Sequence, residues 1–288
     1  MTVHHSVFAE RLFEFLFNAE FIHKNSASVI GMPHIPSQEE EKWLGYDVAF
    51  NLQNGGGVIN ALALQHKVVR LVDGPGSGAN KAFRNAAGNP YFAFPVDPVQ
   101  FNTIEALVSQ NLPGLEFYFC APLFVDQPNL DARYAAKDLD AHSVYIDVNG
   151  VGQLDESISH SIVYTPNGNE AWVFSEDPKS LTIRRVAPGE QNQNRQREEV
   201  SLEQIQRLYS TAFELVANGY ARRVERQLAR RLPKDVALVG QFSALSRQLQ
   251  EGAPVRVSFD SKALGWLAIS RLFAIYLDAT TIVQRCAA

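Results

Sequence analysis

The chain has 288 residues and a formal net charge of −5 at neutral pH. This charge excludes a global positive field that would draw the protein to nucleic acid or anionic lipid, so any such contact must come from a local patch. Hydrophobic residues make up 46% of the chain and charged residues 20%, as in folded globular proteins. Cys120 and Cys286 lie far apart and form neither a metal-ligand spacing nor a disulfide framework, which favours a reducing, cytoplasmic setting.

Neither end of the chain has the pattern of a membrane-directed segment. Glu10 and Arg11 interrupt the apolar residues that a signal peptide would need. Residues 263–283 are apolar but include Arg271 and Asp278, whereas a membrane span needs about 20 nearly uncharged residues. We therefore expect no membrane association, and we interpret 263–283 as a helix that is buried or lies at an interface, for example in a homo-oligomer.

Hydrophobic spacing predicts a helix followed by a β-hairpin in the first part of the chain. Phenylalanine and leucine repeat with helical periodicity over 5–22, and 29–32 reads as a short strand. Residues 46–50 and 58–69 read as two strands joined by the glycine-rich turn at 53–57.

The middle of the chain predicts further strands around one helix. Residues 70–85 read as a flexible loop, because their glycines are not followed by the Gly-Lys-Ser/Thr ending of a nucleotide-binding loop. Strands are predicted at 91–94, 115–120, 144–148, 161–164 and 171–174, and a helix at 101–110. A helix between the hairpin and the next strand implies a crossover, so the predicted fold class is α/β, a mixed β-sheet flanked by helices.

Composition changes sharply at 188–199, where a polar run cannot bury apolar surface. We predict an α/β domain with extra strands over 1–187, a polar linker or loop over 188–200, and a helical C-terminal region over 201–288.

The hairpin carries a set of polar side chains with metal-binding chemistry. Gln65 and Lys67 are two residues apart on the second strand, so they share a face, and the first strand brings Asp47 alongside. Hard divalent cations prefer oxygen ligands, which Asp47, Gln65 and the backbone carbonyl of His66 could supply. A carboxylate of the first helix would complete the site, with Glu10 favoured by its position on the helix.

These predicted elements come in the order of a helix with Glu10, a hairpin with Asp47 and Gln65-x-Lys67, a further helix and a strand. Over residues 1–125 this order resembles the restriction-endonuclease-like, or PD-(D/E)XK, nuclease superfamily. The resemblance implies Mg²⁺- or Mn²⁺-dependent hydrolysis of phosphodiester bonds, usually in DNA. Asp47, Gln65, Glu10 and His66 would hold the metal ion, and Lys67 would stabilise charge or assist the attacking water. It further implies a role in restriction or antiviral defence beside a partner ATPase or helicase.

Other interpretations remain open on the same residues. Gln65 replaces the usual acid, as in some branches of the superfamily, and a neutral amide binds metal less strongly than a carboxylate. The domain could therefore be a catalytically inactive, nuclease-like binding or scaffold subunit, or the set could be an ordinary solvated sheet face. Glu14 and Glu20 are alternatives to Glu10.

A stripe of arginines is the other candidate for nucleic-acid contact. Arg222, Arg226 and Arg230 recur every four residues and Arg223 widens the stripe, which would let a helix follow a phosphate backbone. The alternative is a solvated helix face, with Glu225 among the arginines.

Overall fold

The computed structural model describes residues 2–36, 45–53, 59–74, 79–109, 115–174 and 178–184 of the chain. The predicted linker at 188–200 and the predicted helical region at 201–288 lie outside the described residues, and the proposed domain boundaries stay predictions.

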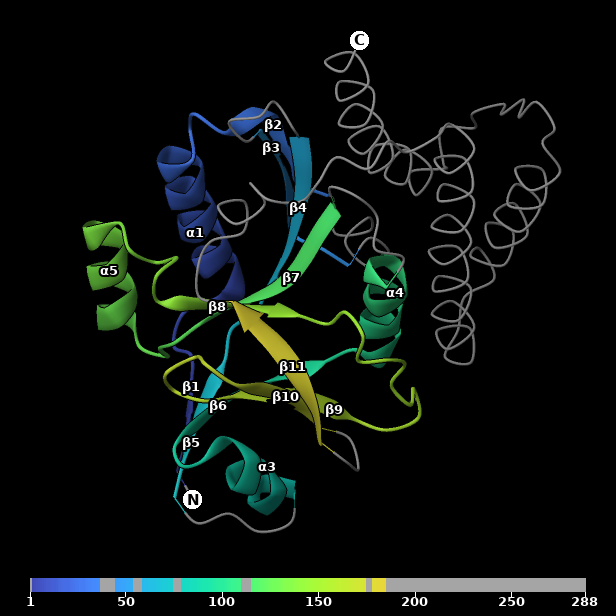
Figure 1. Cartoon of the computed structure of the whole chain (residues 1–288). Helices are drawn as coiled ribbons and strands as arrows, with labels where there is room; N and C mark the ends of the chain where they lie inside the picture. The colour runs from blue at the N-terminus through green and yellow to red at the C-terminus, as the bar shows by residue number, and fades with distance from the viewer. Residues whose placement is uncertain are drawn as a thin grey trace, which may run out of the picture.

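The described residues form eleven strands and four helices (Figure 1). The strands are β1 (Thr2–His5), β2 (Val29–His34), β3 (Val48–Gln53), β4 (Ile59–His66), β5 (Arg70–Asp73), β6 (Tyr91–Val96), β7 (Leu115–Pro122), β8 (Ser143–Asp147), β9 (His160–Tyr164), β10 (Ala171–Phe174) and β11 (Pro178–Arg184). The helices are α1 (Glu10–Lys24), α3 (Ala79–Ala87), α4 (Pro98–Val108) and α5 (Gln127–Ala136).

All of these strands belong to one mixed sheet with the order β1-β5-β6-β9-β10-β11-β8-β7-β4-β3-β2. β3 and β4 form the predicted antiparallel hairpin, and β4 pairs in parallel with β7 after a crossover that includes α4. A parallel pair needs such a long connection, whereas the hairpin does not. The predicted α/β fold class with a mixed sheet is confirmed.

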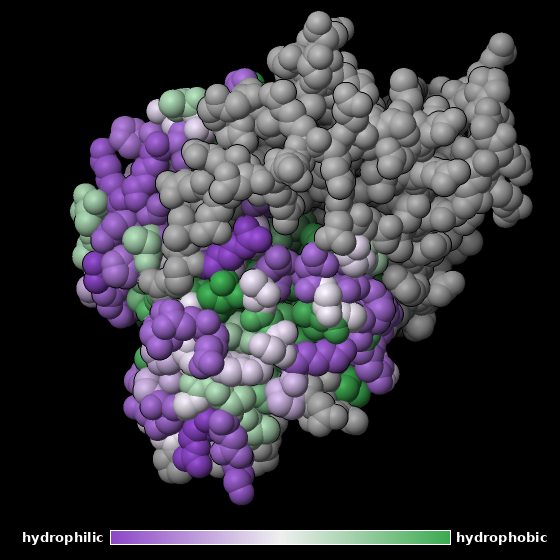
Figure 2. Space-filling view, in the orientation of Figure 1, coloured by the Kyte–Doolittle hydropathy of each residue, from purple (hydrophilic) through white to green (hydrophobic). Residues whose placement is uncertain are grey.

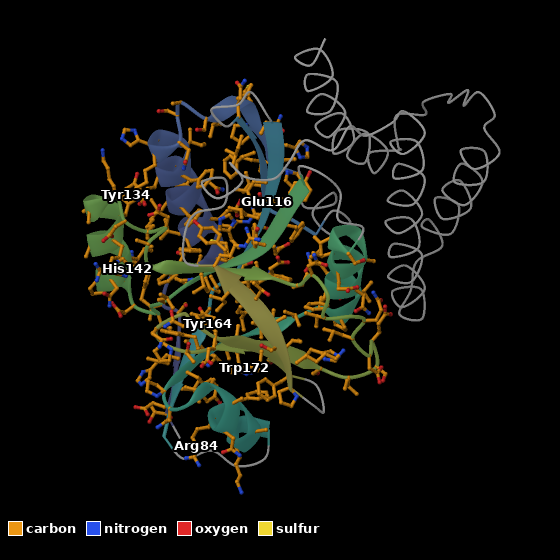
Figure 3. All side chains as sticks on the ribbon, in the orientation of Figure 1. Arg84, Glu116, Tyr134, His142, Tyr164 and Trp172 are labelled. Atoms are coloured by element: carbon orange, nitrogen blue, oxygen red, sulfur yellow. The ribbon has the colours of Figure 1, made fainter. Side chains whose placement is uncertain are left out.

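Strand β11 joins the two halves of the sheet. Its Leu181 pairs with Ala171 of β10, whereas its Arg184 pairs with Tyr145 of β8. The two halves pack against each other through a shared apolar core, in which Tyr164 of β9 donates a hydrogen bond of 2.5 Å to the carbonyl oxygen of Pro122 on β7 (Figure 3).

Three of the four described helices cover the outer faces of this folded sheet, and α4 lies at the core between its halves. Phe13, Phe17 and Phe21 of α1 are at most 1% exposed and pack with Phe50 and Leu64 of the hairpin. α5 lies beside α1, α3 packs on β9 and β10, and α4 borders the core between the two halves (Figure 1). The hairpin is therefore enclosed by α1 on one face and by the core next to α4 on the other.

The structure corrects several element boundaries. The first helix begins at Glu10 rather than at residue 5, because residues 2–5 pair as β1 with β5. The hairpin strands are Val48–Gln53 and Ile59–His66 instead of 46–50 and 58–69, so Lys67 lies just beyond its strand.

The predicted loop at 70–85 is wrong, because it contains β5 and most of α3. Tertiary pairing explains β5, which lies between β1 and β6 and buries Val72. Phe83 anchors α3 on Phe174, with 4.5 Å between the ring centroids. α5 and β11 were also not predicted, although Asp126 caps α5 by accepting a hydrogen bond from the backbone of Asn129.

Figure 2 shows that, on the face turned to the viewer, apolar residues gather in a band across the middle, over β8 and β11, between more polar surfaces. Within the described ranges, no helix combines the length and the apolar character needed to cross a membrane.

Candidate functional site

The structure brings Asp47 and Gln65 together where the hairpin ends. The β3–β4 register, continued by one residue, sets Asp47 opposite Gln65. Gln65 Nε2 donates a hydrogen bond of 2.9 Å to Asp47 Oδ1. Asp47 is 7% exposed and Gln65 is fully buried, so they are not the solvated sheet face that was one alternative.

His66 contributes to the site through its backbone, while its ring faces the other way. The backbone N–H of His66 donates to Asp47 Oδ2 over 2.5 Å. Its ring lies against Phe13 and Phe17, with centroid separations of 5.9 and 5.3 Å, as strand alternation predicts. Both ring nitrogens are buried without a hydrogen-bond partner, and Nδ1 is 3.6 Å from Asp47 Oδ2.

Lys67 and Glu10 form a second pair next to the first. Lys67 Nζ lies 3.9 Å from Glu10 Oε1, and the backbone N–H of Val68 donates to Glu10 Oε2 over 3.1 Å. The Lys67 side chain is 17% exposed and that of Glu10 is 40% exposed. Glu10 is the first residue of α1, so the helix start points a carboxylate at the end of β4. The segment 65–67 thus links both pairs.

Gln100 of α4 is a member of this network that the sequence did not suggest. Its Nε2 donates a hydrogen bond of 3.0 Å to Gln65 Oε1, across the core side of the hairpin. Asp97 holds the first turn of α4 by accepting hydrogen bonds from the backbones of Val99 and Gln100. No motif or spacing connects residues 65 and 100, so only the packing of α4 could reveal this contact.

Cys120 of β7 lies beside the site, but its thiol is neither a nucleophile nor a metal ligand there. Burial, with a smaller contribution from the nearby Asp47 carboxylate, raises the pKa of the Cys120 thiol well above its ordinary value. Because the thiolate is the nucleophile and the metal ligand, a thiol held protonated serves neither role. Cys120 instead positions the neighbouring strand, since its carbonyl accepts the backbone N–H of Lys67.

The oxygen donors at this site are those that a hard divalent cation prefers. In the described part of the chain, no group of three or more His, Cys, Asp or Glu side chains is arranged to hold a metal ion. Each oxygen of Asp47 accepts one hydrogen bond and keeps a second lone pair. Gln65, however, turns its nitrogen toward Asp47, so it fits a cation there only if its carboxamide rotates.

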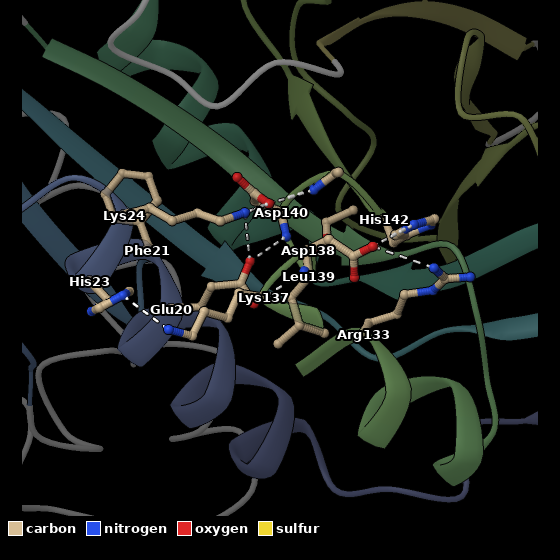
Figure 4. Close-up of polar contacts among 12 residues, drawn as sticks. Glu20, Phe21, His23, Lys24, Arg133, Lys137, Asp138, Leu139, Asp140 and His142 are labelled. Atoms are coloured by element: carbon tan, nitrogen blue, oxygen red, sulfur yellow. Dashed lines mark hydrogen bonds and ion pairs between the residues drawn. The ribbon is translucent and has the colours of Figure 1, made fainter. Parts of the chain in front are cut away.

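Of the alternative acids, Glu20 has a structural role (Figure 4). It is 4% exposed, accepts hydrogen bonds from the backbones of Leu139 and Asp140, and lies 3.0 Å from Lys24 Nζ. Lys24 also donates to the Asp140 carboxylate, so this network ties the end of α1 to the segment before β8. Glu20 therefore stabilises the contact between these elements.

The arginine stripe of Arg222, Arg223, Arg226 and Arg230 lies outside the described residues, and its contact with nucleic acid stays a prediction. Comparisons of the chain with protein-family models, with curated proteins and with solved structures found no match.

Proposed function

We propose that this protein is a metal-dependent nuclease that hydrolyses phosphodiester bonds, with DNA as its substrate and Mg²⁺ or Mn²⁺ as its cofactor. The observation that carries the proposal is that the segment 65–67 joins two pairs of the predicted side chains. Asp47 is hydrogen-bonded to Gln65. Two residues after Gln65, the Nζ atom of Lys67 lies 3.9 Å from Glu10 Oε1. Two such pairs, joined by one short segment at the end of a hairpin, support the resemblance to restriction-endonuclease-like nucleases.

The connectivity around these residues supports the same proposal. A helix that begins with Glu10 precedes an antiparallel hairpin, and a crossover with α4 leads to β7 in parallel with β4. This is the order of elements that the resemblance requires, with β2 inserted before the hairpin and β5, α3 and β6 inserted before the crossover helix.

Each residue would have a distinct task. Asp47, Glu10, Gln65 through its amide oxygen and the backbone carbonyl of His66 would hold the cation. A bound cation supplies an activated water and neutralises charge on the phosphate. Lys67 would stabilise the negative charge that develops on the phosphate oxygens or assist the attacking water, and it is partly buried, which strengthens such an interaction.

One observation favours a second function, that of a catalytically inactive, nuclease-like binding or scaffold subunit. Gln65 is fully buried with both ends of its amide in hydrogen bonds to Asp47 and Gln100. Such a satisfied network stabilises a fold without any cation. A scaffold of this kind would bind nucleic acid or a partner ATPase or helicase and cleave nothing.

A cleavage assay separates the two functions. Purified protein would be incubated with plasmid DNA and Mg²⁺ or Mn²⁺, beside Lys67→Ala and the matched control Lys81→Ala on α3. A nuclease predicts cleavage by the wild type and by Lys81→Ala, with a loss of at least about 100-fold in Lys67→Ala, the scale of removing one group that stabilises developing charge.

Equal cleavage by all three proteins would refute this placement of the site. Absence of cleavage by any of them, under both metals, would favour the scaffold function.

A further inference from the structure

Three side chains form a directional chain of hydrogen bonds from α4 to the hairpin. Gln100 Nε2 donates to Gln65 Oε1 over 3.0 Å, and Gln65 Nε2 donates to Asp47 Oδ1 over 2.9 Å. Gln65 is fully buried, so its amide has no water to turn to instead.

The charge of Asp47 fixes the direction of this chain. An ionised carboxylate can only accept hydrogen bonds, so the amide nitrogen of Gln65 must face Asp47. Its oxygen then faces Gln100, which must donate. A divalent cation at Asp47 requires the opposite arrangement, because cations bind the amide oxygen and not the nitrogen.

We propose that Gln100 is a positioning residue that sets which end of the Gln65 amide faces Asp47, and thereby regulates cation binding at the site. A carboxamide at position 100 can donate or accept, so the chain can reverse as a unit. In the reversed state Gln65 turns its oxygen to the cation and donates its N–H to Gln100 Oε1. This inference rests on the proposed metal-dependent function.

The packing of α4 makes Gln100 suited to this role. Asp97 fixes the first turn of the helix, because its carboxylate accepts hydrogen bonds from the backbone N–H groups of Val99 and Gln100. A Cβ atom built at Gly45 would lie 3.4 Å from Gln100 Cγ, which shows how closely the helix approaches the segment that leads into β3.

Substitutions at position 100 test the inference because they change the two directions differently. The carboxylate of Gln100→Glu can only accept hydrogen bonds. It therefore opposes the cation-free state, in which residue 100 donates to Gln65, and supports the reversed state, in which Gln65 donates to residue 100. We expect a melting temperature several degrees lower in EDTA and an affinity for Mn²⁺ about tenfold higher than in the wild type. Gln100→Met supports neither direction, so the melting temperature in EDTA should fall while the affinity for Mn²⁺ stays within about threefold.

A general charge effect of the added carboxylate is separated by repeating the series in Gln65→Met. If Gln100 acts through Gln65, the gain of Gln100→Glu disappears in this background, as a double-mutant cycle would report. A gain that persists in Gln65→Met would overturn the inference, as would a Gln100→Glu affinity equal to that of the wild type.

Calorimetric titration with Mn²⁺ and thermal unfolding with and without the ion also separate this inference from the proposed function. Binding by the wild type without an effect of Gln100→Glu rejects the inference alone. Binding of Mn²⁺ only by Gln100→Glu supports the inference and means that the Gln65 amide of the wild type is held in the direction that excludes the cation. If neither protein binds Mn²⁺, the metal-dependent function and the inference both fail.

Discussion

Asp47 has two tasks at the scale of single residues. It is the central acid of the proposed site, and it also satisfies two buried donors, Gln65 Nε2 and the backbone N–H of His66. A buried donor without a partner costs about 1–3 kcal/mol. Loss of activity on substituting Asp47 can therefore arise from the fold as well as from the chemistry.

We expect Asp47→Ala to lower the free energy of unfolding by about 2–4 kcal/mol in metal-free buffer, because it leaves both donors unpaired. Chemical denaturation measures this change. Asp131→Ala is the matched control, since it removes an exposed carboxylate of α5 and should change stability by at most about 0.5 kcal/mol. Equal stabilities of the two variants would show that Asp47 does not support the fold.

At the scale of elements, the close contact between α4 and the entry to β3 holds the site together. Gly45 has φ +73°, and a Cβ atom there would lie 3.0 Å from Ile104 Cγ1 of α4. Any side chain at this position is strained by the left-handed backbone and also presses on the helix. The helix that carries Gln100 therefore depends on a glycine two residues before Asp47.

Comparison with Gly150→Ala isolates the packing part of this effect. Gly150 has φ +78° but no atom within 4 Å of a built Cβ, so its substitution reports backbone strain of about 1–2 kcal/mol. Gly45→Ala should lose a further 1–3 kcal/mol, roughly the cost of overpacking. Denaturant unfolding measures both variants. Ile104→Ala should relieve part of the additional loss, and equal losses at the two glycines would contradict the close contact.

At the scale of the whole molecule, buried phenol and thiol groups make the fold sensitive to alkali. Burial raises the pKa of Tyr118, Tyr164 and Cys120 well above their ordinary values. In the unfolded chain these groups lose protons near pH 8.5 to 10, roughly the ordinary range of thiols and phenols, whereas the folded protein keeps them protonated. The folded state then binds more protons, so stability falls as pH rises.

We expect the free energy of unfolding to decline above about pH 9, with each such group adding a slope of about 1.4 kcal/mol per pH unit. Urea unfolding between pH 7 and pH 11 measures this slope. Tyr118→Phe should lower stability near neutral pH, because it removes the hydrogen bond of 3.1 Å to Glu116, yet reduce the alkaline slope by one proton. An unchanged slope in Tyr118→Phe would contradict the assignment.

The local features of this fold follow from residue spacing along the chain. Alternation in the hairpin and the helical repeat of phenylalanine and leucine over 5–22 predicted β3, β4 and α1, because burying one face requires such spacing. The buried face of α1 is that of Phe13, Phe17 and Phe21, whereas Leu12 and Phe15, which the repeat also included, are exposed. The helix between the hairpin and the strand at 115–120 predicted a crossover and a mixed sheet, and the structure has β4 paired in parallel with β7. The predicted hairpin also placed Asp47 alongside Gln65, and in the structure the two side chains are hydrogen-bonded.

Features that depend on partners distant in sequence could be seen only in the folded protein. β1 and β5 stabilise each other as neighbouring strands, and neither segment has a pattern that shows this pairing. The burial of Gln65 and the hydrogen bond from Gln100 arise because α4 packs on the core side of the hairpin. Sequence spacing shows which face of an element a residue occupies, but not which other element packs on that face. Gln65 accepts a hydrogen bond from Gln100 because α4 packs on its face of the hairpin.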